Sequence, residues 1–134
     1  MLSLPSETRF LDAWRAGDTD FPFCPCASIH LYTAYLRWYR ENGVRNPRES
    51  NQFLGKVARI PGWANDNTWV YDSLYFSGQP RKQRMVIPDR AELEKSGYSP
   101  TDSNKQPVAT KSQWLTVGYF KFQGAMNARE EVAA

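Results

Sequence analysis

The residues with the most distinctive chemistry lie between positions 45 and 59, where long basic side chains alternate with amides. Asn51 and Gln52 each carry a paired donor and acceptor, which the major-groove edge of adenine requires. Arg48 has the forked guanidinium that suits guanine, and the neighbouring cations could bind phosphates. These residue types predict contacts with nucleic acid, made by Arg45, Arg48, Asn51, Gln52, Lys56 and Arg59.

A second group of cations follows a Gly-Gln-Pro turn at 78–80 and consists of Arg81, Lys82 and Arg84. The β-forming residues 69–71 and 85–87 on either side of the turn predict a hairpin. Side chains near a hairpin tip have reach and little packing duty. We therefore expect these three cations to bind DNA phosphates, which carry no sequence information.

The distribution of charge along the chain supports a nucleic-acid-binding role for both groups of cations. Residues 1–30 hold two basic and four acidic side chains, a net charge of −2. Residues 31–88 hold nine basic and four acidic side chains, a net charge of +5, and residues 89–134 hold six of each. The excess positive charge lies in the middle segment, as expected of a segment that binds a polyanion.

Catalytic and metal-binding patterns are weak in comparison. Cys24, Cys26 and His30 offer three potential zinc ligands, but no second cluster supplies a fourth. We expect reduced thiols that pack beside the next helix. The acidic pairs that could bind Mg²⁺ are interpreted as solubilising loop residues, namely Asp66 with Asp72 and Asp18 with Asp20. Without a nucleophile–base pair, the chain is predicted to be non-enzymatic, with no cofactor and no metal.

Three predicted helices must position the cations. The first lies between a Ser6 cap and Gly17, and the second spans 29–42 after a Ser28 cap. Their apolar stripes, at helical spacing, are interpreted as core. They comprise Phe10, Leu11 and Trp14 in the first helix, and Leu31, Tyr35, Trp38 and Tyr39 in the second, with Tyr32 and Leu36 beside them.

The third predicted helix, 47–59, carries the first group of cations. Asn46 is the expected cap, Pro47 occupies the first position, and Glu49 closes a capping box. The inward face is formed by Ser50, Phe53, Leu54 and Val57, and the outward face by Arg48, Asn51, Gln52, Gly55, Lys56 and Arg59. Three helices and a basic hairpin in this order predict a winged helix-turn-helix, a mainly α fold of the α+β class.

Residues 89–134 are predicted to form a helical extension to a winged-helix DNA-binding domain at 1–88. Asp89 and Glu92 could close a capping box for a short helix ending at Gly97, and a polar linker follows. A Thr110–Gln113 capping box then begins an aromatic helix, although a strand at 119–122 is an alternative. The aromatic helix could serve packing, self-association or binding to replication proteins.

The segment "SIHLYTAYLRWYRENG" followed by "PRESNQFLGKVARIPG" resembles the C-terminal winged-helix domain of phage and plasmid primase–helicases, of the satellite-phage and poxvirus type. The matching residues are Leu31, Tyr32, Tyr35, Trp38, Glu41, Asn42, Gly43 and Phe53. The resemblance covers roughly residues 6–88 and implies binding to double-stranded DNA at a replication origin. No G-x-x-x-x-G-K-[ST] motif occurs in this sequence, so the ATPase motor of that family has no counterpart here.

Non-catalytic binding of duplex DNA at a replication site of a mobile genetic element is therefore the leading hypothesis. The alternatives are a winged-helix module for protein–protein interaction, in which the hairpin and the aromatic helix bind a partner, and a transcriptional repressor. The chain has no apolar run of membrane-spanning length and no secretory signal. These features favour a cytoplasmic protein, or a segment of a larger one, with no membrane partner.

Overall fold

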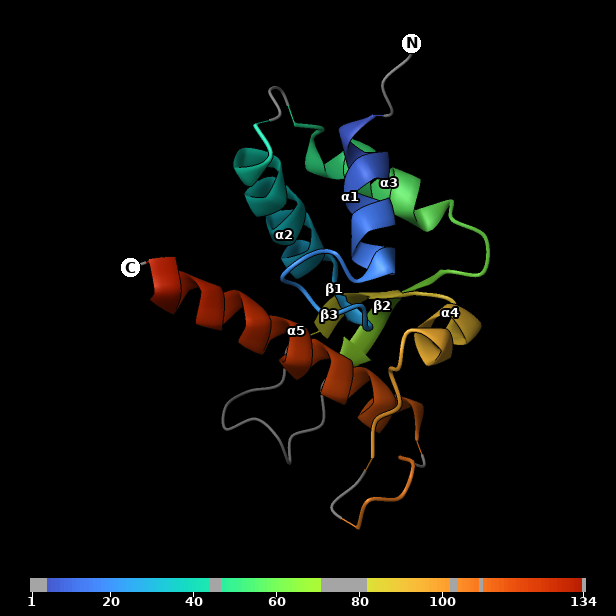
Figure 1. Cartoon of the computed structure of the whole chain (residues 1–134). Coiled ribbons are helices and arrows are strands. Elements are labelled where there is room, and N and C mark those ends of the chain that lie inside the picture. Colours follow the sequence, from blue (N-terminus) through green and yellow to red (C-terminus); the bar gives the residue numbers. More distant parts are fainter. Residues whose placement is uncertain (1–4, 44–46, 71–81, 102–103, 109, 134) are drawn as a thin grey trace.

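The computed structural model describes residues 5–43, 47–70, 82–101, 104–108 and 110–133, with backbone alone at 67–70, 82–83 and 129–133. These residues form five helices and a three-stranded antiparallel sheet (Figure 1). The predicted α+β class is therefore confirmed. In chain order the elements are α1 (Ser6–Ala16), β1 (Cys26–Ala27), α2 (Ser28–Glu41), α3 (Ser50–Ala58), β2 (Ala64–Val70), β3 (Lys82–Ile87), α4 (Arg90–Lys95) and α5 (Lys111–Ala133).

The sheet has the strand order β1-β3-β2, so β3 is its central strand. The predicted hairpin arms are confirmed as β2 and β3, although β2 begins at Ala64, earlier than expected. The turn predicted at 78–80 lies outside the described residues. The short strand β1 was not predicted, and it pairs Cys26 with Val86 and Ala27 with Met85.

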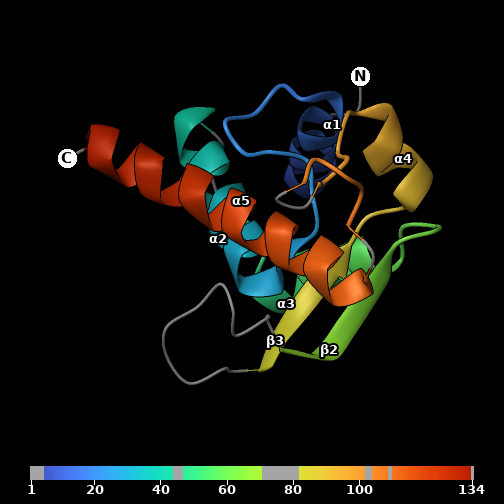
Figure 2. The same ribbon diagram turned by 90° about the horizontal axis from the view of Figure 1, so that it is seen from below.

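Helices cover both faces of this sheet. Successive side chains of a strand point to opposite faces, yet Met85 and Val86 of β3 are both fully buried. Val86 belongs to the core formed with α1, α2 and α3. Met85 packs instead with Leu115 and Tyr119 of α5, which crosses the sheet in Figure 2. β3 is thus held between two helical layers.

The main core lies among α1, α2 and α3. Tyr35 of α2 stacks on Phe53 of α3 with their ring centroids 4.5 Å apart, and Phe10 of α1 meets both rings at 5.8 and 6.0 Å. Trp14 is also fully buried. The apolar stripes predicted for these helices are therefore confirmed as core, and they set the position of α3.

The C-terminal segment shares this core. Leu93, Tyr98, Phe122 and Met126 belong to the same buried cluster as Phe10, so one core spans both sides of Pro88. The predicted aromatic helix is confirmed as α5, which excludes the alternative strand at 119–122. Its predicted capping box is also confirmed: Gln113 N–H donates to Thr110 Oγ1 at 3.1 Å, and Thr110 N–H donates to Gln113 Oε1 at 3.4 Å.

Four other predicted capping arrangements were wrong. The Ser6 hydroxyl bonds to the Tyr35 hydroxyl at 2.8 Å and does not cap α1, and Ser28 is the first residue of α2. Asp89 occupies the cap position of α4, but the predicted capping box is absent, because the Glu92 carboxylate accepts hydrogen bonds from Arg15 and Trp63. For Ser6 and Glu92, a tertiary partner has replaced a local one.

The fourth wrong cap concerns the start of α3. Glu49, not Asn46, occupies the cap position and forms a capping box with Gln52. Arg48 lies outside the helix because its N–H donates to the Tyr35 hydroxyl and its carbonyl accepts from the Tyr32 hydroxyl, both at 2.9 Å. These two tyrosines of α2 hold the chain before α3.

Over the residues described, no helix combines the length and the apolar character needed to traverse a lipid bilayer.

Candidate nucleic-acid interface

The outward surface of α3 is defined by what the helix buries. Phe53 and Val57 are fully buried, whereas Asn51 and Gln52 are exposed. The side chain of Gln52 also has a local role, because its Oε1 accepts from the Glu49 N–H at 3.3 Å. Asn51 makes no side-chain hydrogen bond within the described part of the chain. Of the two amides, Asn51 is the freer to pair with a base edge.

Arg48 and Lys56 are placed differently from the expectation that they face outward. Arg48 Nε lies 3.3 Å from Glu7 Oε2, and Lys56 Nζ lies 3.7 Å from Glu7 Oε1. Lys56 also donates to the Thr8 hydroxyl. Both cations are therefore turned toward α1, although 49% of the Arg48 side chain and 39% of the Lys56 side chain remain exposed.

Arg59 and Arg84 are exposed and form no ion pair with any residue that the structure describes. Arg59 follows the last turn of α3 as its C-cap. Arg84 is two residues from Val86 on β3, so the strand directs both toward the face that carries α2. Arg45 and Arg81 lie outside the described residues, as does the side chain of Lys82.

Glu7 is the residue of this interface that the sequence interpretation missed. Its side chain is only 9% exposed, which is unusual for a carboxylate. The signal was present, since Glu7, Phe10, Leu11 and Trp14 follow the i, i+3, i+4, i+7 spacing of one helix face. A nearly buried carboxylate on an apolar stripe needs partners for its charge, and Arg48 and Lys56 are those partners.

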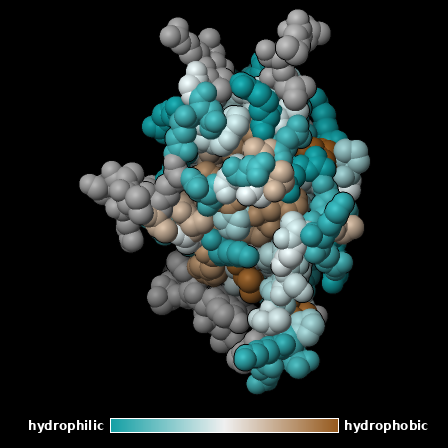
Figure 3. Space-filling view, in the orientation of Figure 1, coloured by the Kyte–Doolittle hydropathy of each residue, from teal (hydrophilic) through white to brown (hydrophobic). Residues whose placement is uncertain are grey.

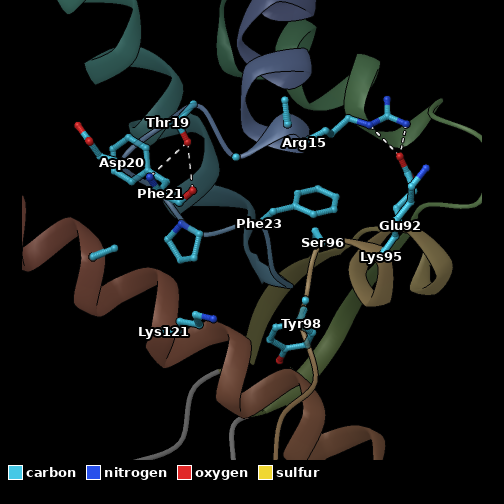
Figure 4. A pocket seen from close by; sticks show the side chains of 15 residues that line it. Arg15, Thr19, Asp20, Phe21, Phe23, Glu92, Lys95, Ser96, Tyr98 and Lys121 are labelled. Carbon is cyan, nitrogen blue, oxygen red and sulfur yellow. Dashed lines mark hydrogen bonds and ion pairs between the residues drawn. The ribbon is translucent and has the colours of Figure 1, made fainter.

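A cleft of about 920 Å³ opens at the other end of α1, among α1, α4 and α5. Phe23 points into it, Lys95 and Lys121 lie along its edge, and Arg15 pairs with Glu92 beside them (Figure 4). Charges of both signs and aromatic rings therefore line the cleft. This composition lacks the concentrated positive charge of the middle segment.

The cysteines are buried, unbridged thiols, as predicted. Burial raises the pKa of Cys24 to about 12, against the opposing charge of Lys121, and raises the pKa of Cys26 well above its ordinary value. A thiol of this kind is a poor nucleophile at neutral pH because almost none of it is thiolate. Among the described residues, no three His, Cys, Asp or Glu side chains are grouped as metal ligands would be.

Comparison with known proteins finds no relative: no family model, no curated protein and no solved structure matches this chain.

Proposed function

We propose that the chain binds double-stranded DNA without catalysing a reaction, as a winged helix-turn-helix. α3 would enter the major groove, and the β2–β3 hairpin would lie over the adjacent phosphates. The observation that carries this proposal is the orientation of α3. Its apolar face is fixed by Phe53 and Val57, which leaves Asn51, Gln52 and Arg59 facing solvent.

The surrounding architecture supports the same function. α1 and α2 pack behind α3, and an antiparallel hairpin follows it, with Arg84 exposed on its returning arm. These elements lie within residues 1–88, and residues 31–88 hold the excess positive charge. The resemblance to primase–helicase domains extends the proposal to recognition of a replication origin or another replication site.

The test is a fluorescence anisotropy titration of the chain with a random-sequence duplex at two salt concentrations. We expect binding that weakens steeply with salt, as phosphate contacts require. Arg59→Ala should reduce the affinity and make the salt slope shallower by about one unit. Lys95→Ala, which removes an equal charge from the cleft, is the control and should bind like the parent. Absence of binding at low salt would contradict the proposal.

A protein-interaction role is the second candidate, and two observations favour it. Ile29 is 65% exposed, and the half-buried ring of Phe23 lines the cleft beside α1. Figure 3 shows hydrophobic residues near the centre of this face, between the regions occupied by α1 and α5 in Figure 1. A chain that binds no duplex at low salt would favour this role.

A further inference from the structure

We infer that the Glu7 carboxylate competes with DNA phosphates for the side chains of Arg48 and Lys56. Glu7 thereby limits the affinity of the chain for duplex DNA of any sequence. This inference rests on the proposed function, because it assigns a regulatory role to a residue beside α3. Glu7 would act on DNA through Arg48 and Lys56 rather than by touching it.

The geometry places one carboxylate between two cations. The two oxygens of Glu7 are divided between them, with Oε2 facing Arg48 Nε and Oε1 facing Lys56 Nζ. Arg48 lies just before α3, and Lys56 lies in its last turn. Glu7 therefore neutralises cations near both ends of the helix that is proposed to enter the groove.

Both cations remain reachable by a phosphate. Each is between one third and one half exposed, whereas the carboxylate that holds them is nearly buried. Arg48 meets Glu7 through Nε, so its terminal nitrogens have no partner within the described chain. Glu7 itself cannot follow a departing cation into solvent, because it belongs to the first turn of α1 on the face that carries Phe10 and Trp14.

The electrostatic consequence follows from the charges. A carboxylate within 4 Å of two cations cancels about half of their combined attraction for an approaching phosphate. Phosphate contacts strengthen binding to every duplex alike. A carboxylate at this position therefore weakens binding to all duplexes and leaves a larger share of the affinity to contacts with base edges.

The experiment compares Glu7→Gln with Asp12→Asn by anisotropy, using the same random-sequence duplex. Asp12 is on the same helix, is exposed, and has no partner among the described residues, so both variants change the charge of α1 equally. We expect Glu7→Gln to bind about three to ten times more tightly and to have a salt slope steeper by roughly 0.9 for each cation released. Asp12→Asn should change the affinity by much less.

A third variant tests whether Glu7 acts on DNA binding through Arg48 and Lys56. In a chain carrying Arg48→Ala and Lys56→Ala, the added Glu7→Gln should produce no gain in affinity for duplex DNA, because the two cations that Glu7 would release are absent. A misfolded fraction can only weaken binding, so it cannot imitate the gain expected of Glu7→Gln in the parent chain. Circular dichroism checks that the chain without the Arg48 and Lys56 side chains is folded.

The outcomes separate the two proposals. If the parent binds and Glu7→Gln binds no more tightly, the inference about Glu7 is wrong and the proposed function stands. If neither protein binds duplex at low salt, both are wrong. A gain that persists in the chain without Arg48 and Lys56 side chains would also overturn the inference.

Discussion

Asn51 and Gln52 are neighbours on α3 with different structural duties. Asn51 projects from the helix without a hydrogen bond to any described residue, whereas Gln52 completes the capping box with Glu49. A residue that caps a helix contributes to folding as well as to any recognition it performs. The two positions therefore separate recognition from stability.

Asn51→Ala should reduce discrimination between a selected duplex and random duplexes by about 1–3 kcal/mol, with little change in melting temperature. Gln52→Ala should also lower the free energy of unfolding by about 0.5–2 kcal/mol, because the capping bond is lost. Competition binding and thermal unfolding measure the two effects. Equal weakening toward every duplex in Asn51→Ala would show that α3 does not read sequence.

The carboxyl group of Glu92 makes the folding stability of the chain depend on pH. Burial alone would raise the pKa of Glu92, but hydrogen bonds from Trp63 and Arg15, with the Arg15 charge, lower it below its ordinary value. The folded state therefore binds this proton less tightly than the unfolded state does. The stabilisation is complete above the ordinary value of about 4.5 and is lost as pH falls through the lower pKa of the folded state.

Glu92→Gln should consequently lower the melting temperature at neutral pH and flatten its decline in acid. Thermal unfolding followed by circular dichroism from neutral to acid pH measures both. Glu94→Gln, which removes an exposed i,i+4 pair with Arg90, is the matched control and should keep the parent's profile. An identical acid decline in the parent and in Glu92→Gln would contradict this account.

At the scale of elements, local patterns predicted the helices and the two paired strands of the hairpin. The spacing of Phe10 and Trp14, and of Leu31 and Tyr35, indicated buried helix faces, and Thr110 with Gln113 indicated the start of α5. The strand β1 had no local signal, because its two residues become a strand only by pairing with β3. The start of α3 was missed for a related reason, since tyrosines of α2 hold Arg48 outside the helix.

The candidate interface could be predicted in part. The amides and cations of α3 follow from their residue types, and the exposure of Asn51, Gln52 and Arg59 agrees with the expected outward face. The pairing of Arg48 and Lys56 with Glu7 could not be derived from local spacing, because Glu7 is far from both cations in the sequence and meets them only through tertiary packing. Glu7 within an apolar stripe indicated that a partner was needed, without indicating which one.

Phe122→Ala tests whether α5 is part of the main core. The ring is fully buried and stacks on Phe21 at 5.6 Å, so its removal should cost about 3–5 kcal/mol of unfolding free energy. Denaturant titration should show one shifted transition. Asn127→Ala, at an exposed position of the same helix, should leave the midpoint unchanged. Two separate transitions would mean that α5 folds independently of α1, α2 and α3.

On the scale of the whole molecule, α1 connects two different surfaces. Its first turn holds Glu7 beside the cations of α3, and its last turn borders the cleft with Lys95 and Lys121. The two candidate functions therefore use opposite ends of one helix.

The measurement that tests the central claim most directly is a map of backbone amide chemical shifts as a random-sequence duplex is added. The account predicts that the largest changes occur along α3, at Asn51, Gln52 and Arg59, and on β3 at Arg84. Lys95 and Lys121, beside the cleft, should change little. Changes confined to the cleft, with α3 unaffected, would contradict the claim that α3 is the surface that binds DNA.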